Sequence, residues 1–177
     1  MAMFMHRVFG AMMLDATVFE DVESSAGATW QATAVVVLSS LAAGIGIGGL
    51  YDRRPSTFAI ASVLALAIWI AWATLTLQIG TRVLPERATH ADLGELMRTV
   101  GFAASPGLFQ IFAVFPRMTL PVIVVTSVWM FAAMVVAVQR ALDYRSVTRA
   151  IGVCLLGAAL VFSLALVMAA ALSRTVS

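Results

Sequence analysis

Three glycines near the end of an apolar run have the spacing of a nucleotide-binding turn. Gly44, Gly46 and Gly49 fit the pattern G-x-G-x-x-G, which serves dinucleotides when a short strand precedes it and an acid follows roughly 20 residues later. Here the preceding run is long enough to cross a membrane, and the glycines lead into the charged turn at 52–55. The next acid after that turn is Glu86. We therefore reject a dinucleotide site.

Other reactive groups are few. His90, Asp92 and Glu95 lie in one polar loop, but three mixed ligands in a surface loop do not specify a metal ion, and we expect none. Cys154 has no base or orienting partner near it in the sequence, so we interpret it as a small buried hydrophobic residue. The motifs Gly-x-Ser-x-Gly and His-Glu-x-x-His are absent from the sequence. We expect a protein that is not an enzyme and has no cofactor.

The composition is that of a membrane protein. Of the 177 residues, 62% are hydrophobic and only 11% are charged, whereas soluble domains carry about 25% charged residues. A net charge of +2 does not indicate a surface that binds nucleic acid. The lipid bilayer is therefore the first partner that we expect. The acids among the first 23 residues interrupt any apolar core of a signal peptide, so we expect no cleaved signal.

Five apolar stretches approach the length of about 20 residues that a membrane-spanning helix needs. They are Trp30–Leu50, Phe58–Ile79, Thr99–Phe115, Pro121–Val138 and Ile151–Leu172. We predict an all-α, polytopic membrane bundle of five transmembrane helices at 30–172. It follows an N-terminal amphipathic segment at 1–29 and ends in a short tail at 173–177.

Arginines set the predicted orientation. With five spans, one side would hold seven arginines and the other side four, and the richer side faces the cytoplasm by the positive-inside rule. The seven are Arg7, Arg82, Arg87, Arg98, Arg140, Arg145 and Arg149, and the four are Arg53, Arg54, Arg117 and Arg174. We therefore predict a bacterial inner-membrane protein with a cytoplasmic N-terminus and an external C-terminus.

Residues 3–19 have the pattern of one amphipathic helix. Phe4, Val8 and Met12 follow a helical period, Phe9 widens this face, and Arg7 falls towards the other side. Such a helix either lies in the membrane interface or packs under the bundle. Two interpretations are also open for the acids at 20–23: they attract the arginines at 140–149, or both segments are simply solvated.

Small residues predict where helices approach closely. Ser40, Gly44 and Gly48 lie four residues apart on one face of the first span, and this spacing favours close packing in lipid. The alternative is that these glycines fray the end of the helix. In the third span, Gly101 and Gly107 flank Pro106, which removes a backbone donor and kinks a helix.

The carbonyl that Pro106 leaves free needs a partner, either Ser105 or a neighbouring helix. A broken helix also occurs at transporter substrate sites. No ionisable residue lies inside any span, however, so we favour a kinked structural helix. We expect His90 or Asp92 to cap its N-terminal end.

Two stretches resemble a known family. The segment LDATVFEDVESSAGATWQA at 14–32 and the segment ELMRTVGFAASPGL at 95–108 are similar to the bacterial members of the Yip family, which are related to the Ypt/Rab-interacting membrane proteins of eukaryotes. The resemblance covers about residues 3–172 and implies five spans with a cytoplasmic N-terminus. It makes Gly101 and Pro106 structural landmarks. In the eukaryotic relatives the family is associated with vesicle trafficking, small GTPase binding and membrane shaping, but the Asp-Leu-Tyr-Gly-Pro type of motif of those relatives is absent here.

The leading hypothesis is a membrane scaffold, assembly factor or membrane-organising protein, with a membrane-protein partner or as a homo-oligomer. We expect six contact residues: Phe4, Arg7, Phe9, Asp92, Glu95 and Arg98. The alternative is a small-solute permease or channel subunit that acts as a homo-oligomer. A pore predicts a wet cavity that reaches Gln110 or Ser105, whereas a scaffold predicts a dry, closely packed bundle.

Overall fold

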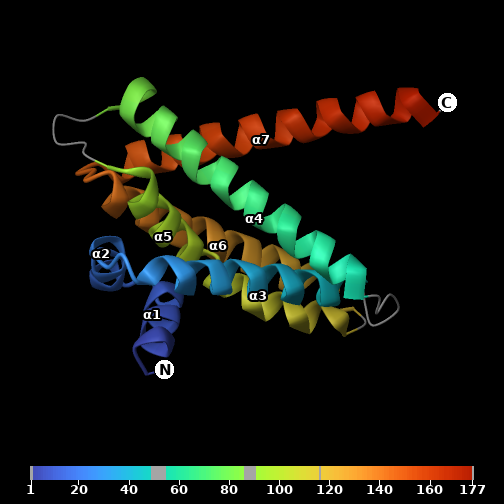
Figure 1. Ribbon diagram of the computed structural model, residues 1–177, viewed down its shortest axis with the longest axis horizontal. Coiled ribbons are helices and arrows are strands. Elements are labelled where there is room, and N and C mark those ends of the chain that lie inside the picture. The colour runs from blue at the N-terminus through green and yellow to red at the C-terminus, as the bar shows by residue number, and fades with distance from the viewer. Residues whose placement is uncertain (1, 49–54, 86–90, 116, 177) are drawn as a thin grey trace.

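A computed structural model describes residues 2–48, 55–85, 91–115 and 117–176, and within these ranges the chain forms helices and turns without a strand (Figure 1). The α-helices are α1 (Ala2–Met12), α2 (Ala16–Ser24), α3 (Ala28–Gly48), α4 (Pro55–Gln78), α5 (Leu93–Ala103), α6 (Thr119–Ala141) and α7 (Val147–Val176). A π-helix, η1 (Ile79–Val83), continues α4, and a 3₁₀-helix, η2 (Ser105–Val114), follows α5. The prediction of an all-α fold is therefore confirmed.

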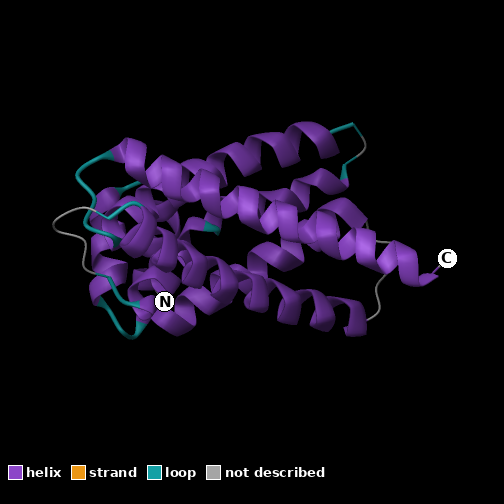
Figure 2. Ribbon diagram, turned by 90° about the horizontal axis from the view of Figure 1, so that it is seen from above, coloured by secondary structure: helices purple, strands orange, loops and turns teal. Residues whose placement is uncertain are grey.

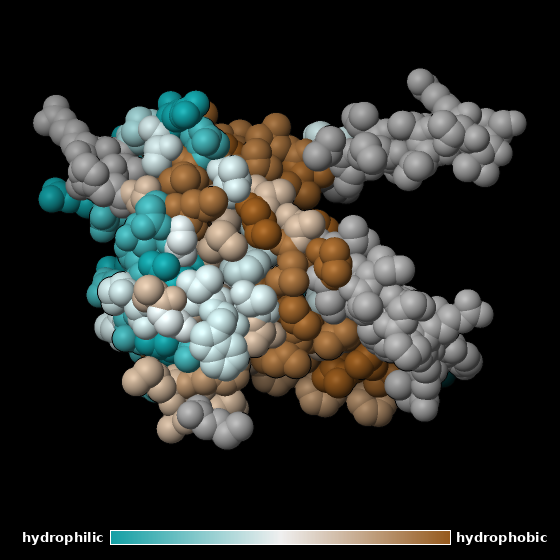
Figure 3. Space-filling model, viewed as in Figure 1, coloured by the Kyte–Doolittle hydropathy of each residue, from teal (hydrophilic) through white to brown (hydrophobic). Residues whose placement is uncertain are grey.

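Among the described residues, three helical stretches are long and apolar enough to cross a membrane. They are Ala28–Gly46, Ala65–Val83 and Thr119–Ala141, and a shorter apolar stretch covers Val147–Val161. Large hydrophobic side chains stand exposed along these helices, for example Leu120, Val128 and Val83, each about two-thirds exposed. Figure 3 shows this apolar surface over the middle of the molecule, with the hydrophilic residues gathered at one end. Such a surface fits contact with lipid rather than water, so the protein is a membrane protein.

The third predicted span is not one kinked helix. The α-helix ends at Ala103, and the chain continues from Ser105 to Val114 as a 3₁₀-helix. Pro106 has no N–H to donate to the carbonyl of Phe102, so the α-helical ladder stops there. The hydroxyl of Ser105 donates to that carbonyl instead, at 2.6 Å, and Ser39 of α3 donates to the carbonyl of Ala104 at 2.8 Å. Of the two partners that the sequence allowed for this carbonyl, Ser105 is the one used, while Ser39 of the neighbouring helix bonds a different carbonyl.

Four segments gather at one end of the molecule, which we call the polar end. They are α2, residues 79–85, the start of α5 and residues 139–149. The phenol of Tyr144 donates to the carbonyl of Gly80 at 2.7 Å, and Arg149 donates to the carbonyl of Pro85 at 2.7 Å. Figures 1 and 2 show the loops at this end, with the last turn of α3 and the first turn of α6 far from it.

Glycines mark the close approaches between helices. A Cβ added at Gly101 would lie 2.7 Å from the Cβ of Ala32, and one at Gly107 would lie 3.1 Å from the sulfur of Met130. A Cβ at Gly46 would overlap the carbonyl oxygen of Gln110, so α3 and η2 meet backbone to backbone there. Without a hydrophobic force between helices in lipid, such contacts supply the packing energy.

The packing face predicted for α3 needs correction. Gly44 is exposed, with nothing within 4 Å of an added Cβ, and Ser40 is half-buried and donates to its own helix at Val37. Gly48 ends α3, and its surroundings lie outside the described residues. The close face instead carries Ser39 and Gly46. Small residues occupy both faces of this helix, so their spacing alone did not choose between them.

The N-terminal segment folds as two helices and not as one. Leu14 adopts a left-handed conformation (φ 61°) after α1, and Asp15 caps α2 by accepting from the amide of Thr17 at 2.9 Å. The reversal brings Val8, Phe19 and Val22 together in the core. Figure 1 shows α1 crossing the direction of α3.

We predict that Gly46→Ala destabilises the protein and that Gly44→Ala does not. The added methyl at position 46 meets the backbone of η2, and overpacking of this kind costs roughly 1–3 kcal/mol. At position 44 the methyl has open space, and alanine is a better helix former than glycine by roughly 0.5–1 kcal/mol. Unfolding of both variants in a denaturing-detergent titration measures the difference. Equal stabilities would contradict the contact between α3 and η2.

Candidate functional site

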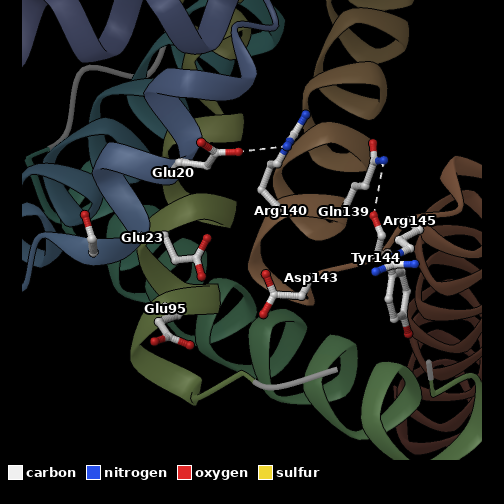
Figure 4. A pocket seen from close by; sticks show the side chains of 9 residues that line it. Glu20, Glu23, Glu95, Gln139, Arg140, Asp143, Tyr144 and Arg145 are labelled. Carbon is white, nitrogen blue, oxygen red and sulfur yellow. Dashed lines mark hydrogen bonds and ion pairs between the residues drawn. The ribbon is translucent and has the colours of Figure 1, made fainter. Parts of the chain in front are cut away.

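A charged hollow of about 690 Å³ lies at the polar end. Its lining comes from α2, α5, α6 and the turn between α6 and α7, and Figure 4 shows the side chains around it. The lining residues are Glu20, Glu23, Ser24, Glu95, Gln139, Arg140, Asp143, Tyr144 and Arg145. Four carboxylates and two guanidinium groups thus converge from segments more than 100 residues apart in the sequence.

Helix ends place these side chains. Asp92 accepts from the amide of Glu95, and the Glu95 carboxylate accepts from the amide of Asp92, each at 2.8 Å. This reciprocal capping box starts α5 at the rim of the hollow, and it confirms the prediction that Asp92 caps this helix. At the end of α6, Asp143 adopts a left-handed conformation (φ 52°) and Tyr144 N–H donates to the carbonyl of Gln139, which closes the helix as a Schellman-type turn.

Arginines fasten α2 to the bundle on both sides of the hollow. Arg140 of α6 pairs with Glu20 at 2.7 Å, so of the two alternatives left open by the sequence, the structure shows the attraction between the N-terminal acids and this segment. Arg98 of α5 donates to the carbonyls of Val22 and Glu23 at the end of α2. A guanidinium group suits this position because it satisfies carbonyls that the helix leaves open and complements the negative end of the helix dipole.

Arg7 also holds the N-terminal helices in place, but from inside. Its side chain is only 4% exposed, and it donates to Asp21 at 2.8 Å and to Gln31 of α3 at 3.0 Å. The prediction that Arg7 faces outward is therefore wrong. A buried guanidinium group requires such partners because an unpaired charge is costly to bury, and here the partners come from α2 and α3.

The other predicted contact residues lie in different environments in the structure. Phe4 is half-buried against Phe102, with ring centroids 6.4 Å apart, whereas Phe9 is 55% exposed. Asp92 and Glu95 cap α5, and Glu95 and its neighbour Arg98 lie beside the hollow. The structure thus brings Glu95 and Arg98 together with α2. It does not bring together all six.

Glu23 has the most perturbed environment in the hollow. Partial burial raises the pKa of its carboxyl to about 7, and the negative charges of Glu95, Asp143 and Glu20 add to this rise, while Arg98 opposes it. In Figure 4 the Glu23 side chain lies between those of Glu95 and Asp143, with no dashed line drawn to it. The hollow therefore has an excess of negative charge around a carboxyl that resists ionisation.

Glu23, Asp143 and Tyr144 were not predicted from the sequence as residues of a site, although all three line the hollow. Only the acids at 20–23 and the arginines at 140–149 were a signal, because opposite charges in two segments predict that they meet. His90 lies outside the described residues. In the part of the chain that is described, no group of three or more His, Cys, Asp or Glu side chains could hold a metal ion.

Comparisons of the chain with protein-family models, with curated proteins and with solved structures found no match. Functional inference therefore depends on the geometry of the chain itself.

We predict that stability falls as the pH rises through the range in which Glu23 titrates. Its pKa in the folded protein, about 7, exceeds the ordinary value of 4.5. Below pH 4.5 both states are protonated, and between pH 4.5 and 7 the unfolded state loses its proton more readily, so the folded state loses stability and the loss is constant above pH 7. After allowance for solvent screening, the loss is on the order of 1 kcal/mol.

Detergent unfolding of the wild type, Glu23→Gln and Glu20→Gln between pH 5 and 8 tests this. Glu23→Gln should remove most of the pH dependence. Glu20→Gln breaks the ion pair with Arg140 and should lower stability while keeping most of the slope, because burial and the charges of Glu95 and Asp143 still raise the pKa of Glu23. A Glu23→Gln protein with the wild-type slope would contradict the assignment.

Proposed function

We propose that the protein is a non-enzymatic membrane scaffold or assembly factor that holds a partner at its polar end. The observation that carries this proposal is the hollow at the polar end, where hydrophilic residues gather beside the apolar surface of the helices. Its lining has four carboxylates against two guanidinium groups. Electrostatic complementarity then favours a partner that presents a basic segment.

Five crossings remain our proposed topology. An α-helix rises about 1.5 Å per residue and a 3₁₀-helix about 2 Å, so the 11 residues of α5 and the 10 residues of η2 reach together about 36 Å. That exceeds the hydrocarbon core of about 30 Å. The segment starts beside the hollow and passes the end of α3 at Gln110, so it runs the length of the bundle. With α7, which has 30 residues, this supports five passes.

We place α1 in the membrane interface. The indole of Trp129 of α6 donates to the carbonyl of Met12 at 2.7 Å, so the end of α1 packs against an apolar helix of the bundle. On its outer face α1 exposes Met5, Phe9 and Met3 by 45–63%. A helix that packs with one side and exposes apolar side chains on the other fits a position at the acyl boundary.

The alternative of a small-solute permease has less support. Ser105 is fully buried, and its hydroxyl donates to the carbonyl of Phe102. A cavity does reach Gln110, but most of its lining residues are apolar. A water-filled path would need polar groups along its length. The scaffold reading, with membership of the Yip family as its family assignment, is therefore our proposal.

We predict that a cation added in the hollow displaces the partner. Ser24→Arg adds a guanidinium group to the lining, and Ala26→Arg adds the same charge two residues away, outside the lining. Ser24→Arg should reduce the retained partner about tenfold in particles excised from native membranes, because like charges at an interface are costly. Quantitative mass spectrometry gives the ratio.

A zero-length carboxyl–amine crosslinker would locate the site at which the partner contacts this chain. Links should join Glu20 or Glu23 to lysines of the partner. Equal retention by Ser24→Arg and Ala26→Arg would contradict docking in the hollow, and particles that contain this chain alone would contradict the scaffold itself.

The orientation has its own test. In a Cys154→Ala background, Ala26→Cys marks the polar end and Arg117→Cys marks the opposite end; both positions are exposed. In intact cells stripped of their outer membrane, an impermeant maleimide should label position 117 and reach position 26 only after the cells are lysed, because the polar end is expected in the cytoplasm. The reverse pattern would refute the cytoplasmic N-terminus.

A further inference from the structure

A second cavity, of about 330 Å³, lies within the apolar part of the bundle, among α3, α4, α6 and the α5–η2 segment. Trp69 and Trp72 line it from α4, and Met130 and Met134 from α6. The polar side chains that reach it are Ser39, Ser40 and Gln110. Cavities of this size, mostly apolar with a few polar groups, are typical of small-molecule sites between helices.

The polar groups of this cavity differ in how well they are satisfied. Ser39 and Ser40 donate their hydroxyl protons to backbone carbonyls of Ala104 and Val37. Trp69 donates its indole N–H to the carbonyl of Met97 at 3.1 Å. These three donors are already used, so a ligand finds only their acceptor lone pairs and their apolar surface.

Gln110 is the exception. Among the described residues, its amide nitrogen has one partner, the thioether of Met130 at 3.8 Å, and sulfur is a weak acceptor. The indole N–H of Trp72 is buried and has no partner among the residues that the structure describes. A donor without an acceptor is costly in a membrane-embedded bundle, where water does not compensate it. The amide of Gln110 therefore calls for a better acceptor than the described part of the chain provides.

We propose that this cavity binds a neutral, membrane-soluble molecule with a ring that bears a carbonyl oxygen. The Gln110 amide donates to the carbonyl, and the indoles of Trp69 and Trp72 contact the ring. Methionine side chains adapt to irregular apolar shapes, which suits Met130 and Met134 at the wall. No lining residue is ionisable, so a charged ligand would lose its hydration without compensation. This proposal goes beyond the scaffold function and does not depend on it.

Other occupants fail on the same grounds. A lipid acyl chain fills the volume and leaves the Gln110 amide without an acceptor. Water would satisfy the amide but would face the apolar side chains of four helical segments. A carbonyl on an apolar body meets both requirements.

Benzophenone is a suitable probe because it is a neutral aromatic ketone and, when photoexcited, inserts into C–H bonds such as those beside the sulfur of methionine. Irradiation of the full chain in nanodiscs should place adducts on Met130 and Met134 in preference to Met13 and Met118, which are 79% and 51% exposed. Gln110→Leu should lower the labelling of Met130 and Met134 about fivefold, as the loss of one hydrogen bond implies. Gln78→Leu, the same substitution at an exposed position outside the cavity, should leave it unchanged.

Competition in the wild-type protein removes any dependence on how the variants fold. Benzanilide carries two rings and a carbonyl and should suppress the labelling, whereas diphenylmethane has two rings without a carbonyl and should not. Labelling spread over the exposed methionines would overturn the proposal and indicate simple partition into lipid. Equal competition by both compounds would also overturn it, because the cavity would then be an apolar space that acyl chains fill.

Discussion

The fold depends on how backbone carbonyls are satisfied where the α-helix of the third apolar segment breaks. Pro106 ends the α-helical ladder inside an apolar bundle, where an unpaired carbonyl costs several kcal/mol. The hydroxyl of Ser105 donates to the carbonyl of Phe102, for which Pro106 has no N–H, and the hydroxyl of Ser39 adds a second donor to the carbonyl of Ala104, which also accepts from the amide of Gly107. The second of these also ties α3 to the break, and Gly46 allows the backbones of α3 and η2 to meet. That contact in turn fixes α5, whose first turn forms one wall of the charged hollow.

At the polar end, charge is distributed unevenly. Arg7, Arg98 and Arg140 are engaged in fastening α1 and α2, through carboxylates in two cases and through helix carbonyls in the third. Arg98 is directed at carbonyls and not at a carboxylate. Burial raises the pKa of Glu23, and the negative charges of Glu95, Asp143 and Glu20 add to this rise, which Arg98 opposes. The lining of the hollow thus has fewer positive than negative groups. A basic partner segment would supply the missing charge, which is why the same arrangement that destabilises the free hollow favours docking.

Much of this architecture could be predicted from the sequence, because it follows from local rules. Uncharged runs predicted the long helices, the polar residues before the third span predicted that His90 or Asp92 caps α5, and Pro106 predicted an interruption, although as a kink in one helix and not as a change to a 3₁₀-helix. Properties that depend on which faces meet were not predictable. The positions of Gly44 and Gly46 differ by two residues in one helix, and only the position of η2 decides which of them is packed. Arg7 was misplaced for the same reason, since the turn at Leu14 directs it inward.

The α5–η2 segment links the hollow and the apolar cavity physically. Glu95 stands at the hollow, while Val100, Ala104 and Gln110 of the same segment line the cavity. Ten residues of 3₁₀-helix are a long run for a conformation usually limited to three or four residues, because its hydrogen bonds are poorer than those of an α-helix. This part of the bundle is therefore held by its neighbours, α3 above all, rather than by its own ladder. A substitution at either site therefore acts on a backbone whose conformation is set by tertiary contacts. We expect substitutions in the hollow and in the cavity to have additive effects on the free energy of unfolding only where they leave the contact of Gly46 with Gln110 intact.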